Sequence, residues 1–374
     1  MTTDAIGLYL HIPFCVRKCN YCDFCSYPVR EAEWKEQYIS RLCEELATYK
    51  GRNIKLDTVF FGGGTPSLLS PDEFSKIAES IDKSFSLSSC AEFSMEVNPG
   101  TLTKEKMSAY TSCGVNRVSI GLQSIHENEL KILGRIHNFD EFLTAYEITQ
   151  GSGVKNINID LMYGIPEQTA ESFERTLDRV VALSPSHLSL SGLILEAGTR
   201  FWDKRDLLSL PDEDIECDMY YLAGKKLSLA GYSHYEISNY AKEGTECRHN
   251  LKYWRDMPYI GVGVSAYSYF DGVRFGNSSD INEYLSSESK KYRYEEVISA
   301  EEEAYEYAML RLRLKEGFSL SDYKKRFGAE FYSGERKGKI DAYSELGYIS
   351  LTEENISLTE SGFYISNKIL TDLL

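Results

Sequence analysis

The chain has 374 residues and a formal net charge of −16 at pH 7, and a length of this order predicts two or three domains. Nucleic acid and anionic lipid surfaces are themselves negative, so the acidic composition disfavours both as partners. No stretch of the sequence approaches the roughly 20 apolar residues that a membrane helix requires, and we expect no stable membrane insertion.

The cysteines indicate a reducing compartment. The chain has nine of them, an odd number, and four lie close together between Cys15 and Cys25. Disulfide frameworks belong to oxidising compartments, whereas crowded cysteines in a reducing one favour a metal site. Residues 1–4 carry no basic region, and no long apolar segment follows them, so we expect no signal peptide and a cytoplasmic protein.

Strand-like and helix-like segments alternate over the first 200 residues. The strand-like segments are short, rich in β-branched or aromatic residues, and mostly end near Gly, Pro or Asn. Helices are predicted near residues 31–49 and 170–183, where apolar side chains recur every four positions. The alternation predicts a parallel sheet with right-handed crossovers, and the apolar run at 58–61 favours a sheet buried on both faces. The six strands are expected at residues 6–12, 58–61, 92–97, 117–121, 156–163 and 187–195.

A cysteine loop directly follows the first predicted strand. Cys15, Cys19 and Cys22 are spaced C-x3-C-x2-C, and each thiolate can bind one iron of a 4Fe-4S cluster. Such clusters usually take four thiolates, so three leave one iron open to a substrate or cofactor. The alternative is a structural zinc ion that also binds Cys25. Zinc sites of four thiolates normally use two separated cysteine pairs, however, and we treat Cys25 as a non-ligand thiol.

Polar or glycine residues stand at or near the ends of several predicted strands. The second strand runs into the Gly-Gly-Gly-Thr segment at 62–65, and Glu96, Gln123 and Asp160 occur at or near the ends of the next three. The pattern fits a closed or partly closed barrel and also an open doubly wound sheet, and in both folds the carboxyl ends of the strands form the site. Any one of these residues could simply cap a strand or form a turn, so the prediction depends on the joint pattern.

The last third of the chain has a different pattern. One helix is predicted near 212–230, and a polar linker near 286–294. A capping box that begins at Ser299 then opens a further helix. Two more helix-like segments precede a strand-and-turn pattern near 356–362, an order typical of a winged-helix module. We therefore predict three parts, at residues 1–200, 201–290 and 291–374.

The cysteine loop and the Gly-Gly-Gly-Thr-Pro segment together resemble the radical S-adenosylmethionine superfamily. More narrowly, motifs along the whole chain resemble the oxygen-independent coproporphyrinogen III oxidase family, at residues 11–15, 62–67, 96–99, 121–124 and 158–166. The resemblance implies an α/β fold, a partial (β/α)6 TIM-like radical S-adenosylmethionine barrel, with a small C-terminal winged-helix-like module.

The same resemblance implies the cofactors and their ligands. The three cysteines would hold a 4Fe-4S cluster, and its open iron would bind the amino and carboxylate groups of S-adenosylmethionine. Glu96 could pair with an ammonium group, Arg135 could grip a carboxylate, and Asp160 could accept hydrogen bonds from ribose hydroxyls. The full set of residues implied around S-adenosylmethionine is Tyr9, Gly63, Thr65, Glu96, Gln123, Arg135 and Asp160.

Two departures favour one branch of that family. Phe24 stands where the oxidases carry a fourth cysteine, and the segment before Cys15 is shorter than their N-terminal arm. Both features, and the His-Asn-Leu-Lys-Tyr-Trp segment at 249–254, resemble a heme chaperone branch. This resemblance implies heme binding with His249 as a candidate iron ligand, delivery of heme to apo-proteins, and a reductant for the cluster. A packed, hydrogen-bonded His249 is the alternative for that residue.

Two alternative functions remain. The first is oxidative decarboxylation of the propionates of coproporphyrinogen III to give protoporphyrinogen IX, against which the two departures argue. The second is nucleic acid binding by the winged-helix-like module, whose clearest basic cluster is Lys324-Lys325-Arg326. The acidic total makes a solvated helix face the better interpretation of that cluster.

Overall fold

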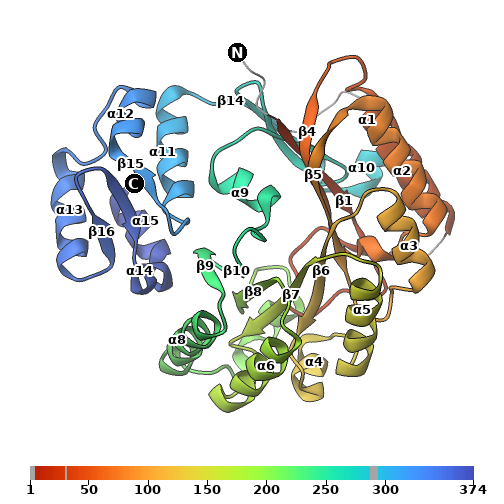
Figure 1. Cartoon of the computed structure of the whole chain (residues 1–374), viewed down its shortest axis with the longest axis horizontal. Helices are drawn as coiled ribbons and strands as arrows, with labels where there is room; N and C mark the ends of the chain where they lie inside the picture. The colour runs from red at the N-terminus through yellow and green to blue at the C-terminus, as the bar shows by residue number, and fades with distance from the viewer. Residues whose placement is uncertain (1–4, 30–31, 287–293) are drawn as a thin grey trace.

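The computed structural model describes residues 5–29, 32–286 and 294–374. Its central feature is a curved sheet with helices on the outer face, and a smaller module of helices stands beside it (Figure 1). The linker predicted at 286–294 falls almost entirely outside the described residues.

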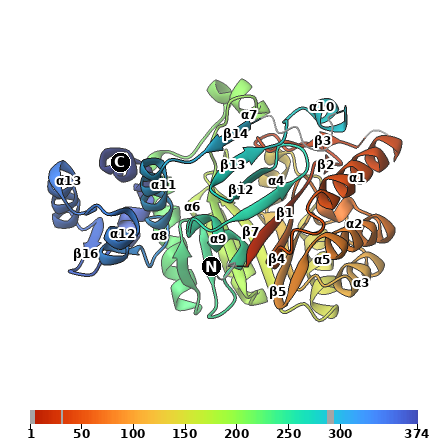
Figure 2. The same cartoon turned by 90° about the horizontal axis from the view of Figure 1, so that it is seen from above.

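Six parallel strands form the middle of a twelve-stranded sheet, and each pairs with the next in chain order. All six strands predicted from the sequence are confirmed, with some ends displaced: β1 (Ile6–Ile12), β4 (Lys55–Gly63), β5 (Ser86–Val97), β6 (Arg117–Gln123), β7 (Asn156–Tyr163) and β8 (His187–Gly192). Between successive strands the chain returns through helices that lie against the outer face (Figure 2). These helices are α1 (Ala32–Ala47), α2 (Pro71–Ser84), α3 (Lys104–Ser112), α4 (Glu127–Leu133), α5 (Phe139–Gly151) and α6 (Ala170–Leu183).

Further strands extend both edges of the parallel sheet. One edge continues from β1 through β11, β12 and β13 to β14, and the other from β8 through β10 to β9. Within the described chain β14 and β9 do not pair with each other, so the fold is the partial barrel rather than a closed one. The added strands are β9 (Ser233–Glu236), β10 (Asn239–Ala241), β11 (Tyr259–Val262), β12 (Tyr267–Phe270), β13 (Val273–Gly276) and β14 (Tyr294–Val297).

The two faces of the parallel sheet differ in polarity. Along β7, Ile157, Ile159 and Leu161 belong to the hydrophobic core beneath the helices, whereas Asn158 and Asp160 lie on the opposite face and hydrogen bond to each other. Successive side chains of a strand point to opposite faces, which produces this alternation. The sheet is buried on both faces as predicted, but only its outer face is apolar.

Local sequence signals start the outer helices. Ser70, Asn138 and Thr169 cap α2, α5 and α6, and in each case the third helical residue returns a hydrogen bond to the cap. In α1, Tyr38 and Leu42 are fully buried, as the four-residue recurrence of apolar side chains predicts. The helices expected near 31–49 and 170–183 are confirmed as α1 and α6.

The C-terminal module has a hydrophobic cluster of its own, which Tyr220 of α8 (Glu213–Leu229) joins. The predicted order of three helices and a hairpin is confirmed, and two short helices that were not predicted follow it. The elements are α11 (Ala300–Arg311), β15 (Phe318–Ser319), α12 (Leu320–Phe327), α13 (Gly334–Glu345), β16 (Ile349–Leu351), β17 (Asn355–Leu358), α14 (Glu360–Tyr364) and α15 (Ser366–Leu373). The helix expected near 212–230 is confirmed as α8, while the three domain boundaries stay a prediction.

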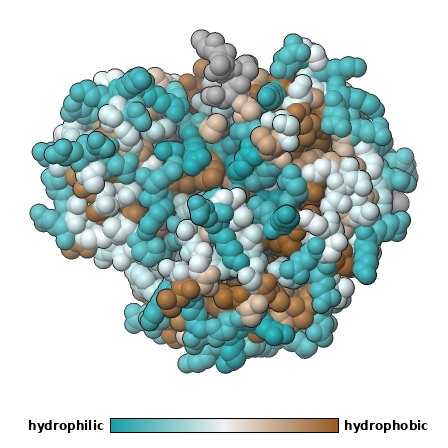
Figure 3. Space-filling view, in the orientation of Figure 1, coloured by the Kyte–Doolittle hydropathy of each residue, from teal (hydrophilic) through white to brown (hydrophobic). Residues whose placement is uncertain are grey.

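Hydrophilic side chains cover most of the face seen in Figure 1, and hydrophobic ones show between them in scattered patches (Figure 3). In the part of the chain that the structure describes, no helix combines the length and the apolar character needed to cross a membrane.

Candidate cofactor site

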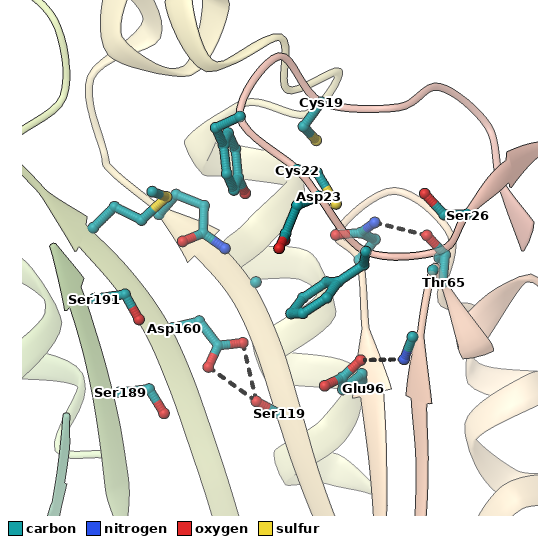
Figure 4. A pocket seen from close by; sticks show the side chains of 18 of the residues that line it. Cys19, Cys22, Asp23, Ser26, Thr65, Glu96, Ser119, Asp160, Ser189 and Ser191 are labelled. Atoms are coloured by element: carbon teal, nitrogen blue, oxygen red, sulfur yellow. Dashed lines mark hydrogen bonds between the residues drawn. The ribbon is translucent and has the colours of Figure 1, made fainter. Parts of the chain in front are cut away.

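A cavity of about 570 Å³ opens between the cysteine loop and the carboxyl ends of β4 to β8 (Figure 4). This volume lies within the range of about 300–1,000 Å³ that is usual for small-molecule sites. Its walls carry Gly63 and Thr65 from the end of β4, Glu96 from β5, Gln123 from β6 and Asp160 from β7. Residues far apart in the sequence meet here because parallel strands all end at one edge of the sheet.

The cysteine loop covers one side of the cavity. Cys15, Cys19 and Cys22 all line it, with Cys15 buried and the other two partly exposed. Asn20 fixes the loop, since its backbone N–H donates to Leu133 O at 2.9 Å and its side-chain amide donates to Ile132 O at 2.8 Å. The spacing of the three cysteines therefore brings three thiols to one cavity, against the end of α4.

Burial raises the pKa of Cys15, and it raises the pKa of Cys22 to about 11. These groups are therefore neutral thiols at pH 7 unless a cation draws off the proton. Bound metal ions do this, because a coordinating thiol is deprotonated outright. The donor set suits a metal cluster better than free thiolate chemistry.

The four cysteines of the loop do not converge on one point. Among the described residues, no group of three His, Cys, Asp or Glu side chains is placed to hold a single metal ion. Cys25 does not line the cavity, and its Sγ lies 3.5 Å from Ser279 O and 3.8 Å from Tyr27 Oη. A mononuclear zinc site of four thiolates does not fit this geometry, whereas a cluster takes each thiolate on a different iron.

The glycine triplet packs against the start of the cysteine loop. Gly63 has a φ of +113°, and a Cβ there would lie 2.6 Å from the ring of His11. A Cβ on Gly64 would lie 2.7 Å from Phe14 O. Only glycine tolerates both the backbone angle and the close approach. The N–H of Gly63 donates to Glu96 Oε2 at 3.0 Å, so the triplet also orients a cavity carboxyl group.

Two partly buried carboxyl groups face the cavity. Burial, and after it the nearby charge of Asp160, raise the pKa of Glu96 to about 8 against the opposing effects of the Gly63 N–H and Arg117. Burial also raises the pKa of Asp160, which accepts hydrogen bonds from Ser119 Oγ at 3.0 and 3.2 Å and from Asn158 Nδ2 at 2.7 Å (Figure 4). Such groups favour a cationic or hydroxyl-rich ligand, which would offset the cost of burying them.

Arg135 joins the cysteine loop to the strand ends. Its guanidinium donates to Asn98 Oδ1 and Gly121 O and lies 3.7 Å from Cys19 Sγ. Gly134, in the left-handed conformation at the end of α4, turns the chain toward this position. Thr65 completes the contacts at the other end of the loop, with its Oγ1 3.6 Å from Cys15 Sγ.

Tyr9 and His249 are not brought into this cavity. The hydroxyl of Tyr9 lies 3.0 Å from His11 Nδ1, on the far side of the loop. His249 is 1% exposed, and both of its ring nitrogens have partners, Thr58 Oγ1 and Tyr253 Oη, each at 2.8 Å. Burial lowers the pKa of His249 to about 3. In this conformation His249 is a packed, hydrogen-bonded residue.

Several lining residues were missed in the sequence. Ser119 and Ser189 line the cavity two residues before Gly121 and Ser191 on the same strands. Because every second side chain of a strand points to the same face, this spacing could have identified both serines. No such signal marks the residues that reach the cavity from loops, from β10 and from α9 (Arg248–Trp254). They include Asn98, Ser238, Asn239 and Asn250.

Comparison with known proteins identifies relatives of the whole chain. The model of the radical S-adenosylmethionine superfamily matches residues 9–180, and that of the HemN C-terminal domain matches residues 298–365. A protein named heme chaperone HemW from Haemophilus influenzae is 34% identical over 98% of this chain and 97% of its own length. Proteins of the same name from Escherichia coli and Bacillus subtilis are 34% and 33% identical, over 98% and 96% of this chain and 97% of each relative.

A solved structure supports the fold alone. Coproporphyrinogen III oxidase (HemN) from Escherichia coli, described as a radical SAM enzyme, superimposes with a TM-score of 0.88 at 22% identity. The match covers 99% of this chain and 90% of that one.

Proposed function

Because the chain belongs to the heme chaperone HemW family, within the radical S-adenosylmethionine superfamily, we propose that it binds heme and delivers it to apo-proteins. A 4Fe-4S cluster and S-adenosylmethionine would be required for the transfer or would regulate it. The observation that carries the proposal is the similarity to proteins of that name along nearly the whole chain. We place this function in the cytoplasm, because the cysteine pattern fits a reducing compartment.

The cavity supports the two cofactors through its donors. Cys15, Cys19 and Cys22 would hold the cluster, and the open space beside them would take S-adenosylmethionine. A reduced cluster held there by the three thiolates would supply one electron to the sulfonium group. Glu96 accepts a hydrogen bond from the Gly63 N–H and would pair with the ammonium group of the ligand. Asp160 would accept hydrogen bonds from ribose hydroxyls, with Ser119 and Asn158 holding its carboxylate in place.

Arg135 has a positioning role in this proposal. Its guanidinium is already engaged with Asn98, Gly121 and Cys19, so it would orient the loop and present one face to the ligand carboxylate. Gln123, with a φ of +72°, and Thr65 would add polar contacts at the cavity wall.

The alternative function, decarboxylation of coproporphyrinogen III, has weaker support. The structural similarity to HemN bears on the fold only, and Phe24 occupies the position of the fourth cysteine of the oxidases. The cations that line the cavity are Arg17, Lys18 and Arg135, a small set for a substrate with four propionates. We therefore retain heme delivery as the proposed function.

One experiment separates the two functions. Anaerobically reconstituted protein is mixed with ferric heme and then with an apo-hemoprotein, and in a second sample with coproporphyrinogen III, S-adenosylmethionine and a reductant. We expect stable heme absorbance that moves to the acceptor, and no protoporphyrinogen. Protoporphyrinogen formation at the rate of an oxidase control, or no heme binding, would contradict the proposal.

A further inference from the structure

A chain of hydrogen bonds runs from Arg135 to the thiols of the cysteine loop. Arg135 Nη2 donates to Asn98 Oδ1, and Asn98 Nδ2 donates to Thr65 Oγ1 at 2.9 Å (Figure 4). The Thr65 hydroxyl then donates to Cys15 Sγ at 3.6 Å, while Arg135 Nη1 donates directly to Cys19 Sγ at 3.7 Å. One guanidinium therefore reaches two of the three thiols that line the cavity. We refer to Arg135, Asn98 and Thr65 together as the thiol relay.

The charge of Arg135 fixes the direction of each hydrogen bond in the thiol relay. A guanidinium can only donate, so Asn98 meets it with the carbonyl oxygen Oδ1 and turns its NH2 group to Thr65. The Thr65 oxygen accepts that bond, which leaves the hydroxyl hydrogen to point at Cys15 Sγ. Thr65 is 2% exposed, so water does not compete for its hydroxyl. Successive hydrogen bonds that point the same way polarise one another, and here every donor points toward sulfur.

The fold holds the middle of the thiol relay in place. Asn98 follows β5 directly, and its backbone N–H donates to Ser67 Oγ at 3.1 Å while its carbonyl accepts from Thr101 Oγ1 at 2.7 Å. Gly121 leaves room for the guanidinium, since a Cβ there would lie 3.1 Å from Arg135 Nη2. The backbone and the cavity wall thus set the positions of these two side chains.

Hydrogen bonds to ligand sulfur have a known effect on iron–sulfur clusters. Reduction of a cluster adds one negative charge, and donors aimed at its thiolates stabilise the reduced form more than the oxidised form. Such bonds are among the factors that set the reduction potential, and residues around the metal ligands commonly supply them.

We propose that Asn98 is a positioning residue for the cluster, and that the thiol relay raises the reduction potential of the cluster through Cys15 and Cys19. The inference rests on the part of the proposed function that places a 4Fe-4S cluster on the three cysteines. In the step concerned, the oxidised cluster accepts one electron from a low-potential external reductant, and no covalent bond forms or breaks. Asn98 acts indirectly, because it orients the Thr65 hydroxyl and holds the guanidinium of Arg135.

This role is distinct from binding S-adenosylmethionine. Among the described residues, the buried Nε of Arg135 has no hydrogen-bond partner, so this atom is left for a ligand while the two terminal nitrogens serve the relay. A contact to S-adenosylmethionine changes the reduction potential only when that ligand is present. The thiol relay acts without it, and this difference makes the two roles separable.

The test is a redox titration of the full-length protein, reconstituted anaerobically with iron and sulfide and kept free of S-adenosylmethionine. Absorbance and electron paramagnetic resonance of the reduced cluster follow the titration. Thr65→Val removes the hydroxyl at nearly constant volume, and the equilibrium constant for reduction should fall by about threefold to tenfold, the range for one lost hydrogen bond. Asn98→Leu disturbs the donors to both sulfurs and should lower that constant at least about tenfold, equivalent to ~59 mV for a one-electron couple.

Two matched variants show whether the hydroxyl itself is responsible. Thr65→Ser keeps a hydroxyl and should keep the wild-type potential. Ser191→Ala removes a cavity hydroxyl outside the thiol relay and should also keep it. The iron and sulfide content of every variant is measured first. If Asn98→Leu takes up no cluster, the comparison of Thr65→Val with Thr65→Ser decides the question.

The outcomes separate this inference from the proposed function. Wild-type protein that assembles no cluster would overturn the cofactor assignment and the inference together. A wild-type cluster whose potential is unchanged in Thr65→Val and Asn98→Leu would overturn the inference alone. The same holds for an equal fall in Ser191→Ala, because any change in the cavity wall would then suffice. A shift that appears only after S-adenosylmethionine is added would also overturn it, since contacts to that ligand would explain the shift.

Discussion

The inner face of the barrel is polar along its whole depth, yet its two ends are built differently. Below the cavity, near the start of β6 (the lower end), Glu92 of β5 accepts hydrogen bonds from the backbone N–H groups of Arg248 (2.9 Å) and His249 (3.0 Å) at the start of α9. At the carboxyl ends, Glu96 accepts one backbone N–H, that of Gly63, and faces a cavity.

Two buried histidines of this lower end are also paired with protein. His187 contacts Asn158 Oδ1 at 2.6 Å and Tyr235 Oη at 2.8 Å, and both ring nitrogens of His249 are engaged. Buried polar side chains therefore do not mark a binding site by themselves. The difference between the two ends is whether the protein supplies the partners or leaves them to a ligand.

The largest expected difference between the two ends concerns their cysteines. Cys19→Ser or Cys22→Ser should abolish the cluster, with iron per chain falling by at least about tenfold, because a three-thiolate site has no ligand to spare. Cys247→Ser, at the fully buried lower end, should retain it. Iron analysis and visible absorbance after anaerobic reconstitution measure both. An intact cluster in either upper variant would contradict the assignment of the cavity.

Replacing the two glutamates by glutamine should change the free energy of unfolding in opposite directions. Glu92→Gln should lower the free energy of unfolding by ~2 kcal/mol, because a charged acceptor of two backbone N–H groups is lost. Glu96→Gln should raise it. Since the folded-state pKa of Glu96 is about 8 against an ordinary 4.5, its ionisation costs folding stability as the pH rises between those values.

Urea unfolding of the metal-free variants at pH 6 and pH 8.5 measures both changes in stability. The stabilisation by Glu96→Gln should be larger at pH 8.5, by on the order of 1–3 kcal/mol. Equal destabilisation by the two variants at both pH values would mean that the two glutamates do not differ in how well the protein satisfies them.

Binding of S-adenosylmethionine should depend on the proton of Glu96. Below a pH of about 8 this carboxyl is protonated in the free protein, because burial raises its pKa, and it must ionise to pair with an ammonium group. Affinity should therefore rise with pH up to that value, by at most about tenfold per unit, with proton release on binding. Calorimetry in buffers of different ionisation enthalpy measures the release, and Glu96→Gln is the control that should show less of it.

The smallest effect is expected at a supporting hydroxyl. Ser119→Ala removes a donor that lies 3.0 Å from the Asp160 carboxylate, and S-adenosylmethionine affinity should fall by about fivefold, equivalent to ~1 kcal/mol. Ser191→Ala, at another serine of the cavity wall, tests whether any serine there has the same effect (Figure 4). An equal loss in both would mean that the cavity wall, rather than Asp160, sets the affinity.

The parallel strands were predictable because their outer faces and flanking turns carry strong local signals. The three cysteines were also predictable from a local signal, because their close spacing in the sequence brings them together. The alternation of Asn158 and Asp160 with Ile157 and Ile159 is visible in the sequence, but the apolar run at 58–61 concealed that the inner face of the sheet is polar.

Other parts of the site have no local signal. Asn239 and Asn250 reach the cavity from β10 and α9, and only the folded sheet brings those elements over the strand ends. His249 illustrates the converse, because a residue singled out by its motif lies beneath the cavity with both nitrogens paired. The chemistry of a side chain can be predicted from sequence, whereas its exposure depends on long-range packing.

The position of β1 has a consequence for biosynthesis. This first strand pairs in parallel with β4 on one side and with β11 (Tyr259–Val262) on the other, so one of its edges has no partner until about 260 residues have left the ribosome. Long-range strand pairing of this kind is slow and leaves an open edge prone to aggregation. Translation must therefore pass two-thirds of the message before the strand that carries the cysteine loop is locked in place, and nascent chains are expected to depend on general folding factors until then.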